Sequence, residues 1–216
     1  MIKIKKLFLD LLFPVSCLGC GRKDVWLCSA CFDKIEINRG PCLVSHSTFL
    51  TEVWAASNYD QPNLSTVLHG FKYRFIRDLG EELGKILIKF LESQTRENLN
   101  FDLIVPIPLA RRRELWRGFN QAEVLAEVLS RKFCWPVSTE LVFRLNYHQP
   151  QVGLKAAQRQ KNVKNVFRAG KTDLVRGKVI LLIDDVVTTG ATMDECAKSL
   201  KMAGAKQVFG LVVAKD

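Results

Sequence analysis

The stretch that decides the fold is VILLIDDVVTTGATMDECAKSL, residues 179–200. It begins with an apolar run, continues with two acids and a turn of Thr and Gly, and ends in a helical pattern. This order predicts a buried parallel strand that leads into the N-terminus of a helix. We therefore expect an anion site at the turn, because the first amides of a helix are unpaired and lie at the positive end of its dipole.

The residue types of the turn suit this chemistry. Gly190 lets the backbone approach an anion closely. Asp184 and Asp185 can accept hydrogen bonds from neighbouring sugar hydroxyls and can help to hold Mg²⁺ on a sugar diphosphate. A purely structural turn is the alternative, but two adjacent acids before TTGAT favour a ligand site. The hydroxyl donors for a phosphate are Thr188, Thr189 and Thr192.

The flanking segments predict strands that alternate with helices. Apolar runs predict strands over 53–59, 101–105, 178–183 and 207–213, and spacings of three and four predict helices over 64–71, 79–91, 120–133 and 191–202. Such alternation indicates an α/β fold with a parallel sheet. Because ligands of these sheets bind beyond the carboxyl ends of the strands, the loops that begin at Pro106 and Asp184 should line one crevice.

The net charge of +10 is concentrated in one part of the chain. Residues 109–178 hold 15 basic and five acidic side chains, which accounts for the whole excess. Clustered positive charge favours a partner rich in phosphate, either a pyrophosphorylated sugar or a nucleic acid backbone. A basic but inert surface is the alternative.

Seven cysteines include two CxxC pairs, CLGC and CSAC. Two residues between cysteines let both thiolates face one tetrahedral site, so we expect structural zinc with four protein ligands. Disulfides or redox-active pairs are the alternatives, but neither a secretory signal nor a thioredoxin-like context supports them. The expected ligands are Cys17, Cys20, Cys28 and Cys31.

The other cysteines receive no functional role. Cys42 and His46 lack matching partners for a second site, and we expect Cys134 and Cys196 to be buried as small hydrophobic side chains.

The first 14 residues, MIKIKKLFLDLLFP, combine basic residues with a short apolar run. Asp10 interrupts this run, which is too short to span a bilayer. We expect a short amphipathic helix that packs on its own domain, with weak contact to an anionic membrane as the alternative.

A second mixed segment, FKYRFIRD at 71–78, interleaves basic and aromatic residues. This pattern suits a nucleic acid backbone with stacked bases, and it equally suits a helix end with its charges in water.

Residues 180–192 resemble the motif with which type I phosphoribosyltransferases bind 5-phosphoribosyl-1-pyrophosphate (PRPP): four apolar residues, two acids, two variable positions and TTG. Other segments narrow the resemblance to the ComF/GntX family, over essentially the whole chain. These are LLFP before the first CxxC, VPIPL at 105–109, RGFNQ at 117–121 and QVGLKAAQRQKNVKNVF at 151–167.

The resemblance implies a type I phosphoribosyltransferase fold with a small N-terminal zinc knuckle. We expect residues 1–50 to form an N-terminal helix and the zinc module, and residues 51–216 to form the phosphoribosyltransferase-like domain. Many relatives carry a second pair of CxxC motifs, whereas this chain has only Cys42 in that region, so we expect one zinc ion.

The resemblance also implies how PRPP binds with Mg²⁺. Asp184 and Asp185 would be the catalytic residues, the loop 106–113 would hold pyrophosphate, and the stretch 155–164 would be a mobile loop that closes over the site. The expected phosphate-binding residues are Asp184, Asp185, Thr188, Thr189, Gly190, Ala191, Thr192, Arg111, Arg112, Arg113, Arg117 and Arg159.

At the level of function, the resemblance implies a cytoplasmic protein associated with DNA uptake in natural competence. One hypothesis is a glycosyltransferase-class enzyme that replaces the pyrophosphate of PRPP by an acceptor nitrogen, although the sequence shows no obvious acceptor site. The alternative is a non-catalytic protein that retains the PRPP loop. It would bind single-stranded DNA, or act as a scaffold for a competence helicase or other DNA-uptake proteins.

Overall fold

The computed structural model describes residues 15–41, 47–94, 100–145 and 166–216. Three predictions fall outside these residues: the N-terminal helix over 1–14, the pair Cys42 and His46, and the mobile loop with Arg159. Among the described residues, no helix is long and apolar enough to cross a bilayer.

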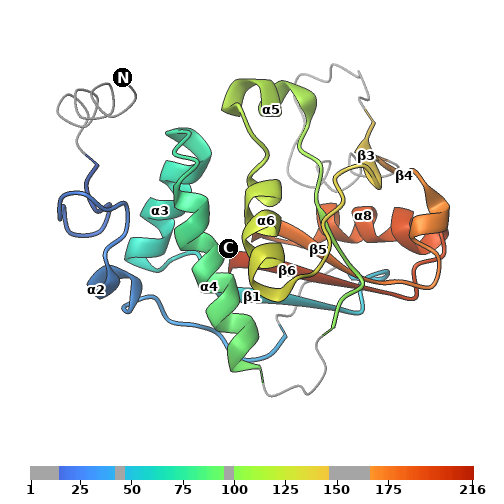
Figure 1. The fold of residues 1–216 in the computed structure, drawn as a ribbon, viewed down its shortest axis with the longest axis horizontal. Coiled ribbons are helices and arrows are strands. Elements are labelled where there is room, and N and C mark those ends of the chain that lie inside the picture. Colours follow the sequence, from blue (N-terminus) through green and yellow to red (C-terminus); the bar gives the residue numbers. More distant parts are fainter. Residues whose placement is uncertain (1–14, 42–46, 95–99, 146–165) are drawn as a thin grey trace.

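A parallel sheet of four strands, in the order β1-β6-β5-β2, forms the centre of the described chain (Figure 1). Every neighbouring pair in it is parallel, which confirms the predicted α/β class. Strand β5 runs through both acids and ends at Val187, beyond the predicted end at residue 183. The strands are β1 (Glu52–Asn58), β2 (Leu103–Pro106), β5 (Val179–Val187) and β6 (Gln207–Lys215).

The sheet is covered on both faces because side chains of a strand alternate between them. Leu181 and Ile183 of β5 belong to the core cluster that includes the apolar sides of α3, α4 and α6. Ile180 and Leu182 belong to the other cluster, beneath α8. The helices are α3 (Pro62–Tyr73), α4 (Leu79–Ser93), α6 (Gln121–Phe133) and α8 (Ala191–Met202).

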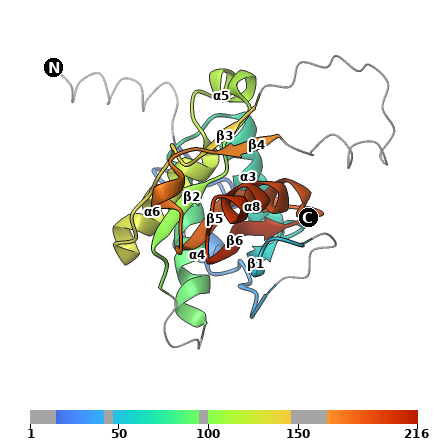
Figure 2. The ribbon, with the colours of Figure 1, turned by 90° about the vertical axis from the view of Figure 1, so that its right-hand side faces the viewer.

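Shorter elements complete the described chain. The β3–β4 hairpin, which the sequence did not predict, lies on the α8 side (Figure 2). Its strands of three residues are too short to give a clear alternation. Arg111–Arg113 form the first turn of a helix, whereas we expected them in a loop. These elements are α2 (Ser29–Phe32), α5 (Arg111–Arg117), β3 (Val142–Arg144), β4 (Phe167–Ala169) and η2 (Thr172–Leu174).

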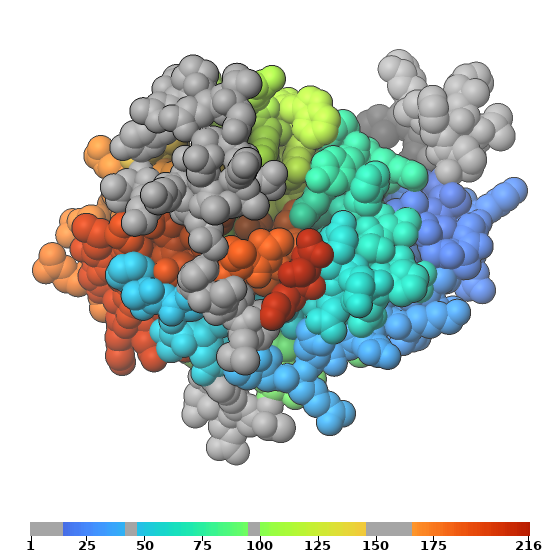
Figure 3. Space-filling view, turned by 180° about the vertical axis from the view of Figure 1, so that it is seen from behind, coloured from blue at the N-terminus to red at the C-terminus, as the bar shows by residue number. Residues whose placement is uncertain are grey.

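The described part of the N-terminal module, residues 15–41, packs against α3. Figure 3 shows it in blue beside α3 in teal, on the side away from α8 in red. Cys17, Cys28 and Cys31 are buried in the same core cluster as the apolar side of α3. The Asn63 side-chain amide also donates to the Cys31 carbonyl at 3.1 Å. A domain boundary at residue 50 stays a prediction.

The two cysteines expected in the core differ. Cys196 is buried, as predicted, but Cys134 is exposed, and that prediction was wrong. Cys134 is the C-cap of α6 with φ +57°, where the chain leaves the helix. Its neighbours Phe133 and Trp135 stack on each other, with 4.5 Å between ring centroids, and Trp135 takes the buried place.

Candidate functional site

The register of the sheet places two loops side by side at its carboxyl edge. Pro106 at the end of β2 lies opposite Ile183 of β5, and the Ile107 amide donates to the Ile183 carbonyl at 2.9 Å. The chain after β2 therefore lies next to Asp184. Residues of both loops line one crevice, as the sequence predicted.

A cup of about 80 Å³ lies where β5 passes into α8. Gly190 precedes the helix with φ +82°, a conformation that residues with a Cβ atom rarely adopt. The first amides of α8 lie at the cup, so it has the geometry of an anion site at a helix N-terminus. Its lining includes six predicted site residues, namely Asp184, Thr188, Thr189, Gly190, Ala191 and Thr192.

The first turn of α8 is tied to the chain that enters β1. One carboxylate oxygen of Asp194 accepts from the backbone amides of Thr48, Phe49 and Leu50 at 2.8, 2.7 and 3.3 Å. Three amides on one oxygen hold the helix start firmly, since each bond to a charged acceptor is stronger than a neutral one. The cup is thereby fixed to the β1 edge of the fold.

A crevice of about 270 Å³ adjoins the cup, and the two linings share Asp184, Val186 and Thr192. It is lined by the cations Lys72, Arg113, Arg117 and Arg144 and by the acids Asp184 and Asp185. The excess of positive charge suits an anionic ligand.

The two acids lie in different electrostatic surroundings. Asp185 is buried, and its Oδ1 pairs with Lys72 Nζ at 2.9 Å. Asp184 keeps part of its surface exposed, but protein atoms surround its carboxyl group. Burial, and then repulsion from Asp185, raises the pKa of Asp184 to about 7, although Lys72 and Arg144 pull the pKa down.

The predicted arginines divide into two groups. Arg113 and Arg117 line the crevice, whereas Arg111 and Arg112 are exposed and are not among its lining residues. A third arginine of the crevice, Arg144 of β3, was not predicted. Burial, and then repulsion from Arg113, lowers the pKa of Arg144, but a guanidinium remains charged at neutral pH.

The start of α6 closes one wall of the crevice. Gly118 ends α5 in the left-handed conformation, φ +77°, which lets the chain turn at once into α6. Asn120 is buried and bonds in two directions. Its Oδ1 accepts from the Ala122 amide and its Nδ2 donates to the Ile107 carbonyl, both at 3.1 Å. These bonds tie the helix start to the loop after β2.

Four lining residues were missed by the sequence interpretation. Lys72 and Tyr73 belong to FKYRFIRD and Gln121 to RGFNQ, so both motifs lie at the crevice, although only Arg117 of their residues was predicted to bind phosphate. Arg144 stands in no motif, and only the hairpin geometry brings it to the crevice.

The four cysteines of the CxxC pairs form a cluster apart from the crevice. Their sulfur atoms all lie within 4.8 Å of one another, so the cluster could bind a metal ion. The Cys28 amide donates to Cys17 Sγ at 3.3 Å. Burial opposes ionisation of Cys17, but backbone amides outweigh it and lower the pKa of this thiol to about 6. A thiolate stabilised in this way is a good metal ligand.

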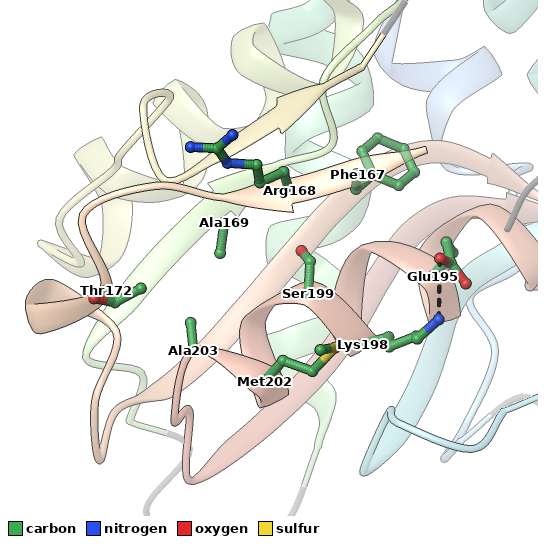
Figure 4. A pocket seen from close by; sticks show the side chains of 9 residues that line it. All are labelled: Phe167, Arg168, Ala169, Thr172, Glu195, Lys198, Ser199, Met202 and Ala203. Atoms are coloured by element: carbon green, nitrogen blue, oxygen red, sulfur yellow. Dashed lines mark hydrogen bonds and ion pairs between the residues drawn. The ribbon is translucent and has the colours of Figure 1, made fainter. Parts of the chain in front are cut away.

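A further cavity of about 300 Å³ lies between β4 and α8 (Figure 4). Ala169, Ala203 and Met202 make part of its wall apolar. Figure 4 shows the Lys198 ammonium directed at Glu195, at 3.5 Å, and not into the cavity. None of the predicted site residues that the structure describes lines this cavity.

The raised pKa of Asp184 predicts a pH effect on stability. The folded state holds a proton on this acid that the unfolded chain has released above about pH 4, so the stability that it contributes at low pH is lost as pH rises towards 7. Asp184→Asn, which does not titrate, should be more stable than the wild type at pH 8, by up to about 4 kcal/mol, with the difference shrinking towards pH 5. Urea unfolding at pH 5, 6, 7 and 8 measures this. Asp173→Asn, at an exposed acid, is the control, and parallel profiles for wild type and Asp184→Asn would contradict the prediction.

Comparison with known proteins agrees with this geometry. The family model described as "Phosphoribosyl transferase domain" matches residues 80–216. Competence protein F of Haemophilus influenzae is 30% identical over 209 residues, which cover 92% of this chain and 90% of that protein. DNA utilization protein YhgH of Escherichia coli K12 is 32% identical over 197 residues, or 89% of this chain and 85% of that protein.

A solved structure of glutamine PRPP amidotransferase from B. subtilis aligns with a TM-score of 0.42 and 17% identity over 82% of this chain and 32% of that chain, which is a weak likeness. The chain belongs to the phosphoribosyl transferase domain family, among the ComF-type competence and DNA utilization proteins.

Proposed function

We propose that this chain binds PRPP or a related ribose phosphate at the cup and the adjoining crevice. The observation that carries the proposal is the pair Asp184 and Asp185 at the carboxyl edge of the sheet, followed directly by the cup at the start of α8. A sugar phosphate needs both features, hydrogen-bond acceptors for its hydroxyls and a donor-rich cup for its phosphate.

Each part of the ligand has a matching group in this arrangement. The ribose hydroxyls would donate to Asp184 and Asp185, and the 5-phosphate would accept from Thr188, Thr189 and the first amides of α8. The diphosphate would face the cations of the crevice, which are Lys72, Arg113, Arg117 and Arg144. Asp184 and Asp185 also offer the oxygen ligands that Mg²⁺ prefers, and the ion would neutralise part of the diphosphate charge.

The same charges would support transfer of the phosphoribosyl group to an acceptor nitrogen. The cations stabilise the departing pyrophosphate, and the two carboxylates stabilise positive charge that develops at the anomeric carbon. No nucleophilic side chain is required for this step. Release of pyrophosphate on addition of an acceptor base would separate an enzyme from a binding protein.

Replacement of both acids tests the ligand site. Asp184→Asn with Asp185→Asn should weaken PRPP binding in the presence of Mg²⁺ by about tenfold or more, because two charge-assisted hydrogen bonds to the ribose are lost. Calorimetric titration measures the affinity, and Asp173→Ala, at an exposed acid outside the site, should bind like the wild type. Equal affinity in the double variant and the wild type would remove the proposed site.

A second candidate function, binding of single-stranded DNA, is favoured by an exposed surface near the crevice. Tyr73, Phe75 and Trp116 are 49%, 39% and 60% exposed, and the Phe75 and Trp116 rings are 5.0 Å apart. The C-terminal end of α3 therefore lies beside α5, as Figure 1 also shows. We call this surface the α3–α5 patch, and it consists of Tyr73, Arg74, Phe75, Arg111, Arg112 and Trp116. Exposed rings on segments that also carry exposed arginines suit stacked bases and a phosphate backbone.

DNA binding by the α3–α5 patch has a salt signature. Affinity for an oligothymidine should fall steeply with salt through counterion release, and Arg111→Gln with Arg112→Gln should make the slope shallower. Trp116→Ala should cost about 1–3 kcal/mol without changing the slope, because stacking is not ionic. Phe143→Ala, at a ring 50% exposed outside the patch, is the matched control. Fluorescence anisotropy at several salt concentrations measures the DNA affinity and its salt dependence. A salt-independent affinity would argue against this function.

The names of the two long relatives extend the proposal to a cellular role. One is called a competence protein and the other a DNA utilization protein. We propose that this chain acts in the cytoplasm in DNA uptake or use. A helicase partner, which belongs to the alternative scaffold hypothesis, stays a prediction.

We also propose that the cysteine cluster holds structural zinc. Purified protein should contain one zinc ion per chain, and Cys28→Ser should lose the metal and unfold at a lower temperature, because binding to the folded state stabilises it. Cys134→Ser, at an exposed cysteine outside the cluster, should keep the metal. Metal analysis and thermal unfolding measure these effects. Zinc-free protein with four titratable N-terminal thiols would refute the assignment.

A further inference from the structure

Arg117 and Gln121 form a coupled pair on one wall of the crevice. Arg117 Nη1 donates to Gln121 Oε1 at 2.8 Å, and the guanidinium lies over the Tyr73 ring, 5.7 Å from its centroid. Gln121 is only 2% exposed. The pair is therefore held by a hydrogen bond and a cation–π contact before any ligand arrives.

The orientation of the Gln121 amide follows from its partner. A guanidinium can only donate hydrogen bonds, so the oxygen of Gln121 must face Arg117 and its NH₂ group must point elsewhere. Among the described residues, Gln121 Nε2 has no hydrogen-bond partner, and neither has Arg117 Nε. Both atoms are buried donors.

Two buried donors without partners are unusual, because each costs free energy comparable to a lost hydrogen bond. Both atoms are shielded from solvent, but they belong to side chains that line the crevice, so a ligand can satisfy them once these side chains turn towards it. That ligand must offer oxygen or nitrogen lone pairs at this wall. A ligand group that presents an N–H there would face the N–H donors of the protein and could form no hydrogen bond with them.

We propose that Arg117 and Gln121 form a donor-only wall that binds paired hydrogen-bond acceptors of the ligand and rejects groups that present N–H. The inference rests on the proposed ribose-phosphate function, since it concerns the crevice next to the phosphate cup. The acceptors have two chemical sources, the oxygens of a diphosphate or the carbonyl edge of a base that receives the sugar.

The test uses Gln121→Leu, which removes the donor, and Gln121→Glu, which replaces it by an acceptor and can keep the bond from Arg117. Lys132→Gln changes the net charge by the same amount as Gln121→Glu, on an exposed position of the same helix, and is the control. Calorimetric titrations use inorganic pyrophosphate alone, ribose 5-phosphate alone, and hypoxanthine or adenine with ribose 5-phosphate present. Urea unfolding shows whether each variant is folded.

A diphosphate source predicts that pyrophosphate binds about tenfold more weakly to Gln121→Leu and more weakly still to Gln121→Glu, as expected for lost bonds to a charged group. A carbonyl source predicts that the wild type prefers hypoxanthine to adenine about tenfold, and that Gln121→Glu reverses this preference. Either result supports the wall.

The wall is refuted if both folded variants bind pyrophosphate and both bases within about twofold of the wild type, or if the wild type binds none of these probes. Ribose 5-phosphate alone separates this failure from that of the proposed function. If the wild type binds ribose 5-phosphate, the proposed ribose-phosphate site stands even when the wall is refuted. If the wild type does not bind it, the proposed site is refuted, whatever the Gln121 variants show.

Discussion

The parallel register between β5 and its neighbours is the constraint on which the site depends. Because Ile183 lies opposite both Pro106 of β2 and Leu211 of β6, the acids that follow it emerge at the carboxyl edge between two flanking strands. The loop after β2 and the start of α8 are then fixed beside them by main-chain geometry. A slip of one residue in β5 would exchange its two apolar faces and bury the acids differently, so the core that covers both faces also fixes the position of the chemistry.

Placing Asp184 and Asp185 together at the end of β5 has an electrostatic cost, which nearby cations offset. Burial at the strand end, and then repulsion between the two adjacent carboxyl groups, raises the pKa of Asp184. Lys72 pairs with Asp185, and the charges of Lys72 and Arg144 also favour the ionised form of Asp184. Both cations come from elements outside the strand–turn–helix motif. The motif alone would be a poor binding site, and α3 and the β3–β4 hairpin supply the compensating charge.

The sequence predicted the strands and helices whose hydrophobic residues follow one clear pattern along the chain. Buried parallel strands appear as apolar runs, and α8 was predicted over its observed residues, because Gly190 and the helical spacing define its limits. Prediction from the sequence failed where tertiary contacts decide which side chains reach the crevice or the core. Arg144 reaches the crevice only through the pairing of β3 with β4, and Cys134 is exposed because Trp135 takes the buried place beside it. Gln121 belonged to a quoted motif, but its role depends on the direction of a side-chain amide, which no spacing reveals.

Contacts between the N-terminal module and α3 explain how this module can affect the crevice. The α3 helix brings Lys72 and Tyr73 to the crevice, yet it lies outside the stretch that matches the family domain, residues 80–216. The module holds α3 along its length. Asn63 near the helix start bonds to the Cys31 carbonyl, and a Cβ at Gly70 near the helix end would meet Leu18 at 3.0 Å. A bound metal would stiffen the chain that makes both contacts. A metal in the cysteine cluster would therefore act on the crevice without reaching it, by fixing the helix that carries Lys72.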